Sequence, residues 1–179
     1  MVPHLHRAVR ARLVCLSLSL SLSLWPLAHA ADAQRQADVA SRGADVMPFD
    51  LKATTHIFTP TADGGTQRVV AKDPADAQQV QLVRSHLQAL RTEFLRGDYT
   101  APTRIHGAEM PGLAELRAAP AGRIDIGYRD IAAGAELAYR TRDATLVAAL
   151  HAWFGAQLSD HGDDAHAGHT HPHDMMSKD

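Results

Sequence analysis

The chain has 179 residues and a formal net charge of −2, with 18 Lys and Arg against 20 Asp and Glu, 12 His and one Cys. This length suits one ordinary domain, and the acidic balance argues against nucleic acid or an anionic membrane surface as the main partner. A glycine-rich phosphate loop, a Gly-x-Ser-x-Gly nucleophile elbow and a Cys-x-x-Cys-His haem motif are all absent, so the common nucleotide, hydrolase and haem signatures are excluded.

The first thirty residues have the pattern of a secretory signal peptide. Three arginines precede an apolar run over residues 13–24, and the small-x-small triplet Ala28-His29-Ala30 follows it, so we expect cleavage after Ala30. The run is shorter than the roughly 20 residues that span a bilayer, so no membrane anchor is expected after cleavage. The protein is then periplasmic or secreted. It also loses its only cysteine, Cys15, which excludes disulfides and thiolate metal sites.

The first structured unit is predicted to be a β-hairpin. Residues 31–45 have almost no apolar pattern and are expected to form a flexible leader, followed by a single domain over residues 46–160. Residues 54–59 (TTHIFT) and 67–72 (QRVVAK) are rich in β-branched and aromatic side chains. Asp63-Gly64-Gly65 between them tolerates the positive φ of a tight turn, which favours the hairpin.

A long amphipathic helix is predicted over residues 74–96. Asp73 is placed to cap its first amides, Pro74 suits its first turn, and Gly97 suits its C-terminal cap. Its apolar side chains recur every three or four residues: Val80, Val83, Leu87, Leu90 and Phe94. A short connecting helix is expected over residues 111–119.

The second half repeats the pattern of two strands and a helix. Residues 123–129 (RIDIGYR) and 135–141 (AELAYRT) alternate apolar and polar side chains, which predicts a second hairpin. Asp143 is placed to cap a helix over residues 144–158, whose apolar side chains form one stripe. These elements predict an α+β domain in the order ββα-ββα, an antiparallel sheet with the two amphipathic helices packed on one face, plus the short connecting helix.

Histidines dominate the C-terminus, where residues 161–179 are expected to form a disordered tail. Neutral imidazole is a good ligand for copper or zinc, and the interleaved aspartates add oxygen donors. Residues two apart point the same way in an extended chain, so the last three histidines can close on one ion. The tail histidines are His161, His166, His169, His171 and His173. The alternative is a solvated terminus whose histidines mainly keep the chain soluble.

A second candidate site is the loop sequence RIHGAEMPG. His106 and Met110 lie close together there, and a thioether beside an imidazole suits copper. The alternative is that Met110 fills the core while His106 hydrogen-bonds to the loop. His56, His86 and His151 flank apolar stripes and are weaker candidates, because a lone histidine there is more typical of the core. If His86, His106 and His151 converge, a site inside the domain is expected.

Four motifs carry a resemblance: HIF at 56–58, GG-x-QRVVAKDP at 64–74, IHGAEMPGLAEL at 105–116 and LHAWFGAQLSDHG at 150–162. Together they resemble a family of small exported bacterial proteins that often end in a His-rich tail. Some similar sequences are described as aspartate carbamoyltransferases, which are larger, cytosolic, two-domain α/β enzymes. The carbamoyl-phosphate motif of those enzymes, Ser-x-Arg-Thr, is absent from this chain.

The sequence therefore predicts a protein that binds, buffers or delivers copper or zinc outside the cytoplasm. The tail would capture the ion, and His106 with Met110 would form a further site in the domain. The first alternative is a non-enzymatic interaction module that binds a periplasmic protein or small molecule, with the tail incidental. The second is a small enzyme, for which no set of catalytic residues stands out. Haem, nucleotides and nucleic acid are not expected as ligands.

Overall fold

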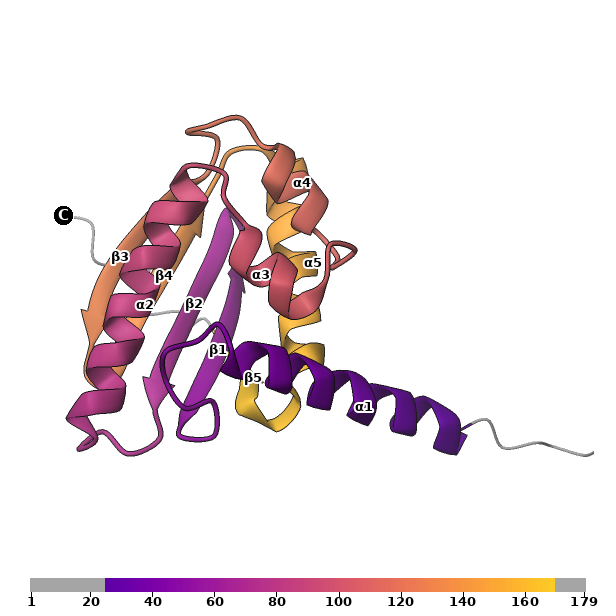
Figure 1. The fold of residues 1–179 in the computed structure, drawn as a ribbon. Helices are drawn as coiled ribbons and strands as arrows, with labels where there is room; N and C mark the ends of the chain where they lie inside the picture. Colours follow the sequence, from indigo (N-terminus) through magenta and orange to yellow (C-terminus); the bar gives the residue numbers. More distant parts are fainter. Residues whose placement is uncertain (1–24, 170–179) are drawn as a thin grey trace, which may run out of the picture.

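The structure, a computed structural model, describes residues 25–169. A five-stranded sheet forms one layer, and helices cover one of its faces (Figure 1). This confirms the predicted α+β class. The order along the chain is α1-β1-β2-α2-α3-α4-β3-β4-α5-β5, with a 3-10 turn before β5. An N-terminal helix, a second connecting helix and a fifth strand are therefore added to the predicted ββα-ββα order.

Both predicted hairpins form. β1 (Thr54–Thr61) pairs antiparallel with β2 (Gly64–Ala71), and β3 (Asp125–Ile131) pairs antiparallel with β4 (Gly134–Arg140). Pairing of β2 with β4 joins the hairpins into one sheet of order β3-β4-β2-β1-β5. The sheet is mixed rather than purely antiparallel, because β5 runs parallel to β1.

The two long helices pack on the sheet as expected. α2 (Ala77–Leu95) lies over β4 and β3, and α5 (Ala144–His161) lies over β1 and β2. Asp143 caps α5 as predicted, because its side chain accepts a hydrogen bond from the amide of Thr145 at 3.0 Å. All five apolar positions predicted for the first helix are buried: Val80, Val83, Leu87, Leu90 and Phe94.

The start of α2 differs from the prediction. Asp76 is the capping residue, and its carboxylate accepts from the amide of Gln79 at 3.0 Å. Asp73 instead closes the preceding turn by accepting from the amide of Ala75 at 2.9 Å. At the other end Gly97 has a φ of +75° and terminates the helix, as expected.

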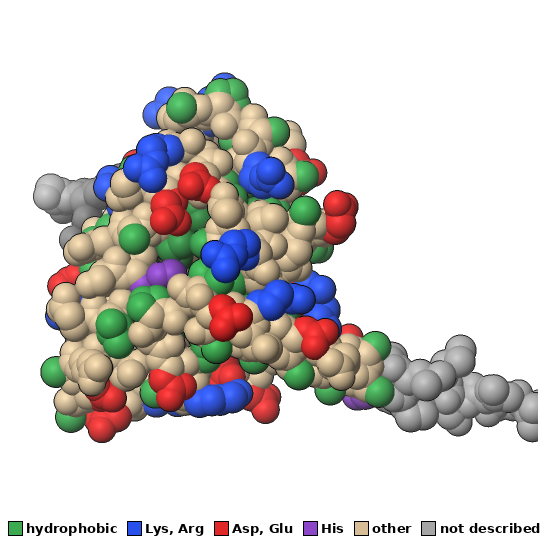
Figure 2. Space-filling view, in the orientation of Figure 1, with side chains coloured by type: hydrophobic (Ala, Val, Ile, Leu, Met, Phe, Trp, Pro, Cys, Tyr) green, Lys and Arg blue, Asp and Glu red, His purple; other side chains and the backbone are tan. Residues whose placement is uncertain are grey.

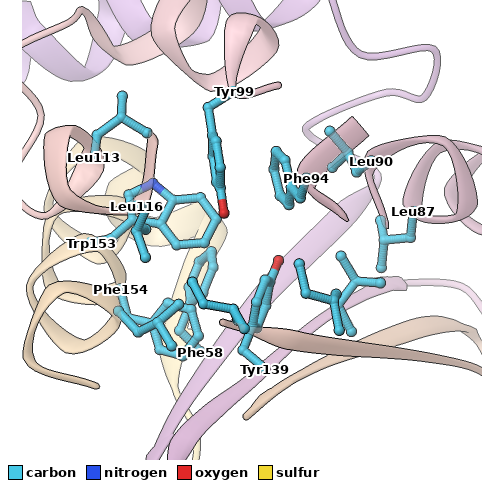
Figure 3. Packing of buried hydrophobic residues seen from close by; sticks show 14 of the residues in the cluster. Phe58, Leu87, Leu90, Phe94, Tyr99, Leu113, Leu116, Tyr139, Trp153 and Phe154 are labelled. Carbon is cyan, nitrogen blue, oxygen red and sulfur yellow. The ribbon is translucent and has the colours of Figure 1, made fainter. Parts of the chain in front are cut away.

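The core lies between the sheet and the helices and is rich in aromatic rings (Figure 3). Trp153 on α5 is at its centre, with ring centroids of Phe94 at 5.9 Å and Tyr139 at 5.9 Å in edge-to-face contact. The short helices α3 (Thr100–His106) and α4 (Leu113–Ala118) close this core on the side away from the sheet. Burial of such large apolar side chains is the main contribution to stability, about 1.5–3 kcal/mol for each one fully buried.

The flexible leader expected over residues 31–45 is wrong, because α1 (Trp25–Ala44) extends through it. α1 packs against α5 and α3. Val39 is 1 % exposed, and the Nε of Arg42 donates to the carbonyl oxygen of Ile105 at 2.6 Å. Alanine, glutamine and arginine favour helix. Hydrogen bonds of Arg35 and Arg42, together with the buried side chain of Val39, hold α1 against the domain without an apolar stripe.

The disordered tail expected from residue 161 is wrong for its first seven residues. α5 continues through His161, a 3-10 turn follows at Gly162–Asp164, and β5 (Ala165–Ala167) pairs with β1. The side chain of Asp164 is held by two lysines, because Lys52 and Lys72 both donate to it. These contacts, together with backbone pairing, extend the domain to the end of β5.

Residues 1–24 and 170–179 lie outside the described residues. The predicted signal peptide falls largely in the first of these segments, and its expected cleavage position after Ala30 falls within α1. None of the helices between residues 25 and 169 combines the length and apolarity needed to cross a membrane.

Candidate functional site

Four histidines from four different elements line one pocket between α2, α3, α5 and the sheet. They are His56 on β1, His86 on α2, His106 at the end of α3 and His161 at the end of α5. Among residues 25–169, no Lys, Arg, Asp or Glu contributes to the lining of this pocket, whose cavity volume is about 30 Å³. In Figure 2, histidine atoms are visible in a hollow between α2 and the segment that follows α1.

A buried carboxylate orients one of these rings. Asp160 is 3 % exposed, and its Oδ2 lies 2.8 Å from Nδ1 of His106, which is 4 % exposed. Burial raises the pKa of the Asp160 carboxyl, but hydrogen bonds from His106 and Arg35 outweigh this effect and hold the pKa below its usual value. Because the carboxylate only accepts, Nδ1 of His106 is the donor, and Nε2 is the nitrogen left for another partner.

Arg35 completes this arrangement from α1. Its Nε and a terminal nitrogen lie 2.5 and 2.7 Å from the two oxygens of Asp160, a bidentate ion pair. The same guanidinium donates to the carbonyl oxygen of His106 at 3.3 Å. An Arg-carboxylate-His chain of this kind fixes the orientation of the imidazole, as the outer-shell groups of metal sites and of general bases do.

Two more rings stack beside His106. The His56 and His161 rings are nearly parallel, with centroids 4.7 Å apart, and His161 meets the His106 ring edge-on at 5.1 Å. Nε2 of His161 lies 3.1 Å from Oε1 of Gln157, one turn earlier on α5. Gly162, with a φ of +52°, ends α5 directly after His161 and thereby places its ring at the pocket.

Burial keeps three of the four rings uncharged at neutral pH. It lowers the pKa of His86 and of His161 to about 4, and it lowers that of His56 well below its usual value, with smaller contributions from neighbouring histidines at His56 and His161. Phe49 contributes to this environment, because its ring lies 5.4 Å from His86 and 6.0 Å from His56. Each neutral ring keeps a nitrogen lone pair, which is what a metal ion or a hydrogen-bond donor requires.

Two buried nitrogens of the pocket lack a hydrogen-bond partner within the described residues. They are Nδ1 of His56 and Nε1 of Trp153, and both residues line the cavity. An unsatisfied buried polar group costs about 1–3 kcal/mol, and native proteins contain few of them. Two in one pocket indicate a place where a water molecule or a ligand belongs.

The rings are not preassembled around one point. Within residues 25–169, no three His, Cys, Asp or Glu side chains are arranged closely enough to hold a metal ion. Parallel stacking explains this, because the nitrogens of His56 and His161 cannot both point at one ion while the planes are 8° apart. One of these two rings has to turn before both can bind the same ion.

The other predicted site residues lie elsewhere. Met110 is 3 % exposed and packs in the hydrophobic core rather than in the four-histidine pocket. Together with His106 and Asp160 it also lines a separate surface hollow of about 530 Å³. Nε2 of His151 donates at the β1–β2 turn, where the carbonyl oxygen of Thr61 lies 3.0 Å away and that of Gly64 lies 2.9 Å away. It does not join His86 and His106 in the pocket.

The tail histidines separate into three groups. His161 belongs to the pocket, and His166 is exposed on β5 opposite Ile57. His169 is exposed at the end of the described residues, and His171 and His173 lie outside them.

Sequence reasoning missed the two charged residues of the Arg-carboxylate-His chain. Arg35 lies in a segment without apolar periodicity, and Asp160 is one of several aspartates near the C-terminus. The available signal was the triplet Asp160-His161-Gly162, in which a glycine can end a helix and leave the two preceding side chains at its C-terminal end.

No protein-family model, no curated protein and no solved structure matches this chain.

Proposed function

We propose that the protein binds a late transition metal ion, copper or zinc, and buffers or delivers it outside the cytoplasm. The observation that carries the proposal is the convergence of four imidazoles from separate elements on one cavity. Three of them are uncharged at neutral pH, and the fourth is oriented by a buried carboxylate. Imidazoles with outer-shell carboxylates are the typical ligand environment of such ions in proteins.

The size of the cavity favours an ion over an organic substrate. Its volume of about 30 Å³ admits one or two water molecules or an ion. Pockets for small organic ligands usually have about 300–1,000 Å³. The Asp160–His106 pair also resembles the base and its orienting group in an enzyme, and an open surface hollow of about 530 Å³, lined in part by Arg35, His106 and Asp160, lies beside it. A small enzyme acting at that hollow is therefore the second candidate function.

Binding requires a change of side-chain rotamer. In such sites the coordinating nitrogen of each imidazole lies about 2.0–2.1 Å from the ion, so all coordinating rings point at one centre. We expect His161 to turn away from its stack on His56, because its hydrogen bond to Gln157 is a single contact near the end of α5. His106 keeps its orientation, since Asp160 and Arg35 hold it.

Titration of the purified protein with Zn(II), and with Cu(I) under reducing conditions, against a competing chelator tests the proposal. We expect one equivalent to bind with submicromolar affinity and the affinity to fall by more than about 100-fold in His106→Ala and His161→Ala, because loss of outer-shell groups alone costs 10–100-fold. His166→Ala is the matched control, since that ring is exposed on β5, and it should bind normally.

Two outcomes would overturn the proposal. One is the absence of submicromolar binding to the unaltered protein for both metals. The other is binding that survives in both pocket variants and is lost when His169, His171 and His173 are replaced together, which would place the ion in the tail. Circular dichroism of each variant, and a metal-dependent rise of Tm in the unaltered protein, show that changes in binding do not come from unfolding.

A further inference from the structure

The pocket offers a soft sulfur donor in addition to its imidazoles. Met47 follows α1, where its amide donates to the carbonyl oxygen of Gly43 at 2.8 Å, and its half-buried side chain lines the same cavity as the four histidines. Met47 also packs against the edge of the core. Met110 is buried in the core and lines a separate hollow beside His106 and Asp160. Thioether sulfur is a ligand that selects Cu(I) among the biological transition metals.

None of the donors in the pocket carries a negative charge. Asp160 is the nearest buried carboxylate, and both of its oxygens are already engaged by Arg35 and His106. The oxygen of Gln157 is bonded to His161, and that of Gln67 accepts from the hydroxyl of Tyr139 at 2.8 Å. The ion would therefore be held by neutral nitrogen and sulfur.

The walls around these donors are apolar. Leu90, Phe94 and Ile105 are buried and line the cavity, and the ring carbons of Trp153 extend this wall, with the indole N–H as its one polar group. The free energy needed to bring an ion from water into such surroundings rises with the square of its charge, so it is about four times larger for a divalent than for a monovalent ion of similar size. Neutral ligands compensate for the second charge less than thiolates or carboxylates do.

We propose that this pocket selects Cu(I) over Zn(II), with the sulfur of Met47 as a ligand beside at least two of the imidazoles. The inference rests on the proposed function, because it names the ion that the same pocket holds. It accounts for the combination of a thioether, neutral imidazoles and apolar walls at one cavity. No change of oxidation state is part of it.

The test compares Met47→Leu with Met110→Leu in the purified protein. Leucine keeps the apolar volume at either position, so both variants are expected to fold. We expect Met47→Leu to weaken Cu(I) binding by about tenfold or more, measured under reducing conditions against a Cu(I) chelator, and to leave Zn(II) affinity unchanged. Met110→Leu should change neither affinity. X-ray absorption of the Cu(I) complex should contain a copper–sulfur contribution that Met47→Leu removes.

The outcomes separate this inference from the proposed function. If the pocket binds Zn(II) more tightly than Cu(I), or if Met47→Leu leaves Cu(I) affinity and the copper–sulfur signal intact, the selectivity inference is overturned while metal binding stands. If neither ion binds with submicromolar affinity, both the inference and the proposed function are overturned.

Discussion

At the scale of single residues, the pocket depends on one ion pair that joins distant parts of the chain. Arg35 and Asp160 are 125 residues apart, and their bidentate contact fixes both a helix end and an imidazole. Asp160 is almost completely buried, while the side chain of Arg35 is 47 % exposed. The pair therefore contributes less to stability than a fully buried one, but removing the arginine leaves a carboxylate with only His106 to stabilise its charge.

Arg35→Ala should reveal both roles of this contact. We expect the free energy of unfolding to fall by about 1–2 kcal/mol, which is below the 3–5 kcal/mol typical of breaking a fully buried pair because solvent reaches the guanidinium. Metal affinity should fall by about 10–100-fold, because the outer shell of His106 is weakened. Urea denaturation and chelator competition measure the two effects. The matched control is Arg104→Ala, an exposed arginine on α3, and an equal effect there would contradict this role of Arg35.

The uncharged histidines also predict how stability depends on pH. In the folded protein the pKa is about 4 for His86 and His161 and is well below its usual value for His56, whereas in the unfolded chain each is near 6.5. Between these values only the unfolded state takes up the protons, so stability is greatest above pH 6.5 and is lost as pH falls toward 4. The nearby charges of Asp160 and Arg35 pair with each other and do not reverse this sign.

Each such histidine contributes up to about 1.4 kcal/mol per pH unit, and partial solvent access at His86 and His161 reduces the sum. We expect the metal-free protein to lose about 2–4 kcal/mol of unfolding free energy between pH 7 and pH 5, measured by urea denaturation. His86→Gln should reduce this loss, and His166→Gln should not. Stability that is constant over this range would contradict the neutral, buried state of the rings.

At the scale of elements, the periodicity of apolar residues predicted the helices and strands whose burial follows from their own sequence pattern. The helix with the stripe from Val80 to Phe94 was confirmed because its apolar residues pack on the sheet. Both hairpins were confirmed because their alternating apolar residues form the buried face of that sheet. α1 was missed because its docking depends mostly on arginine contacts with residues far along the chain, which leave no local repeat. β5 was missed because three residues of Ala-His-Ala gain their order only from pairing with β1.

The sequence predicted only part of the candidate site, because part of it depends on tertiary packing. His86 and His106 were among the histidines expected to converge, but His161 rather than His151 completes the group with His56. These two rings lie ten residues apart on α5, and the choice between them depends on how far the helix extends and how it crosses the sheet. Helix length and crossing are set by tertiary packing, which a single sequence does not display.

Amide hydrogen exchange tests whether α1 is a docked helix. We expect slowed exchange from Val39 to Ala44, because these amides are bonded within the helix and Val39 is buried. Exchange of this segment at the rate of an unstructured peptide would contradict the docking of α1 through Arg35 and Arg42. Arg42→Ala should speed exchange in α1 while leaving α2 protected.

At the scale of the whole molecule, one layer of helices on a single sheet creates the pocket. α2 lies over β3 and β4, and α5 lies over β1 and β2 (Figure 1). α3 and the segment that follows α1 close the space between them. The histidines come from β1, α2, α3 and α5, so the pocket exists only when all of these elements have packed. Metal binding should therefore be coupled to global folding and should raise Tm.

The most direct measurement of metal binding in the pocket is the NMR spectrum of the histidine rings during addition of one equivalent of metal. The proposed function predicts that the ring nitrogen signals of His106, His161 and either His56 or His86 shift together, with saturation at one equivalent. His166 and the rings beyond residue 168 should remain unchanged until the pocket is full. Shifts that begin at those exposed histidines while the pocket signals stay in place would contradict the proposed function.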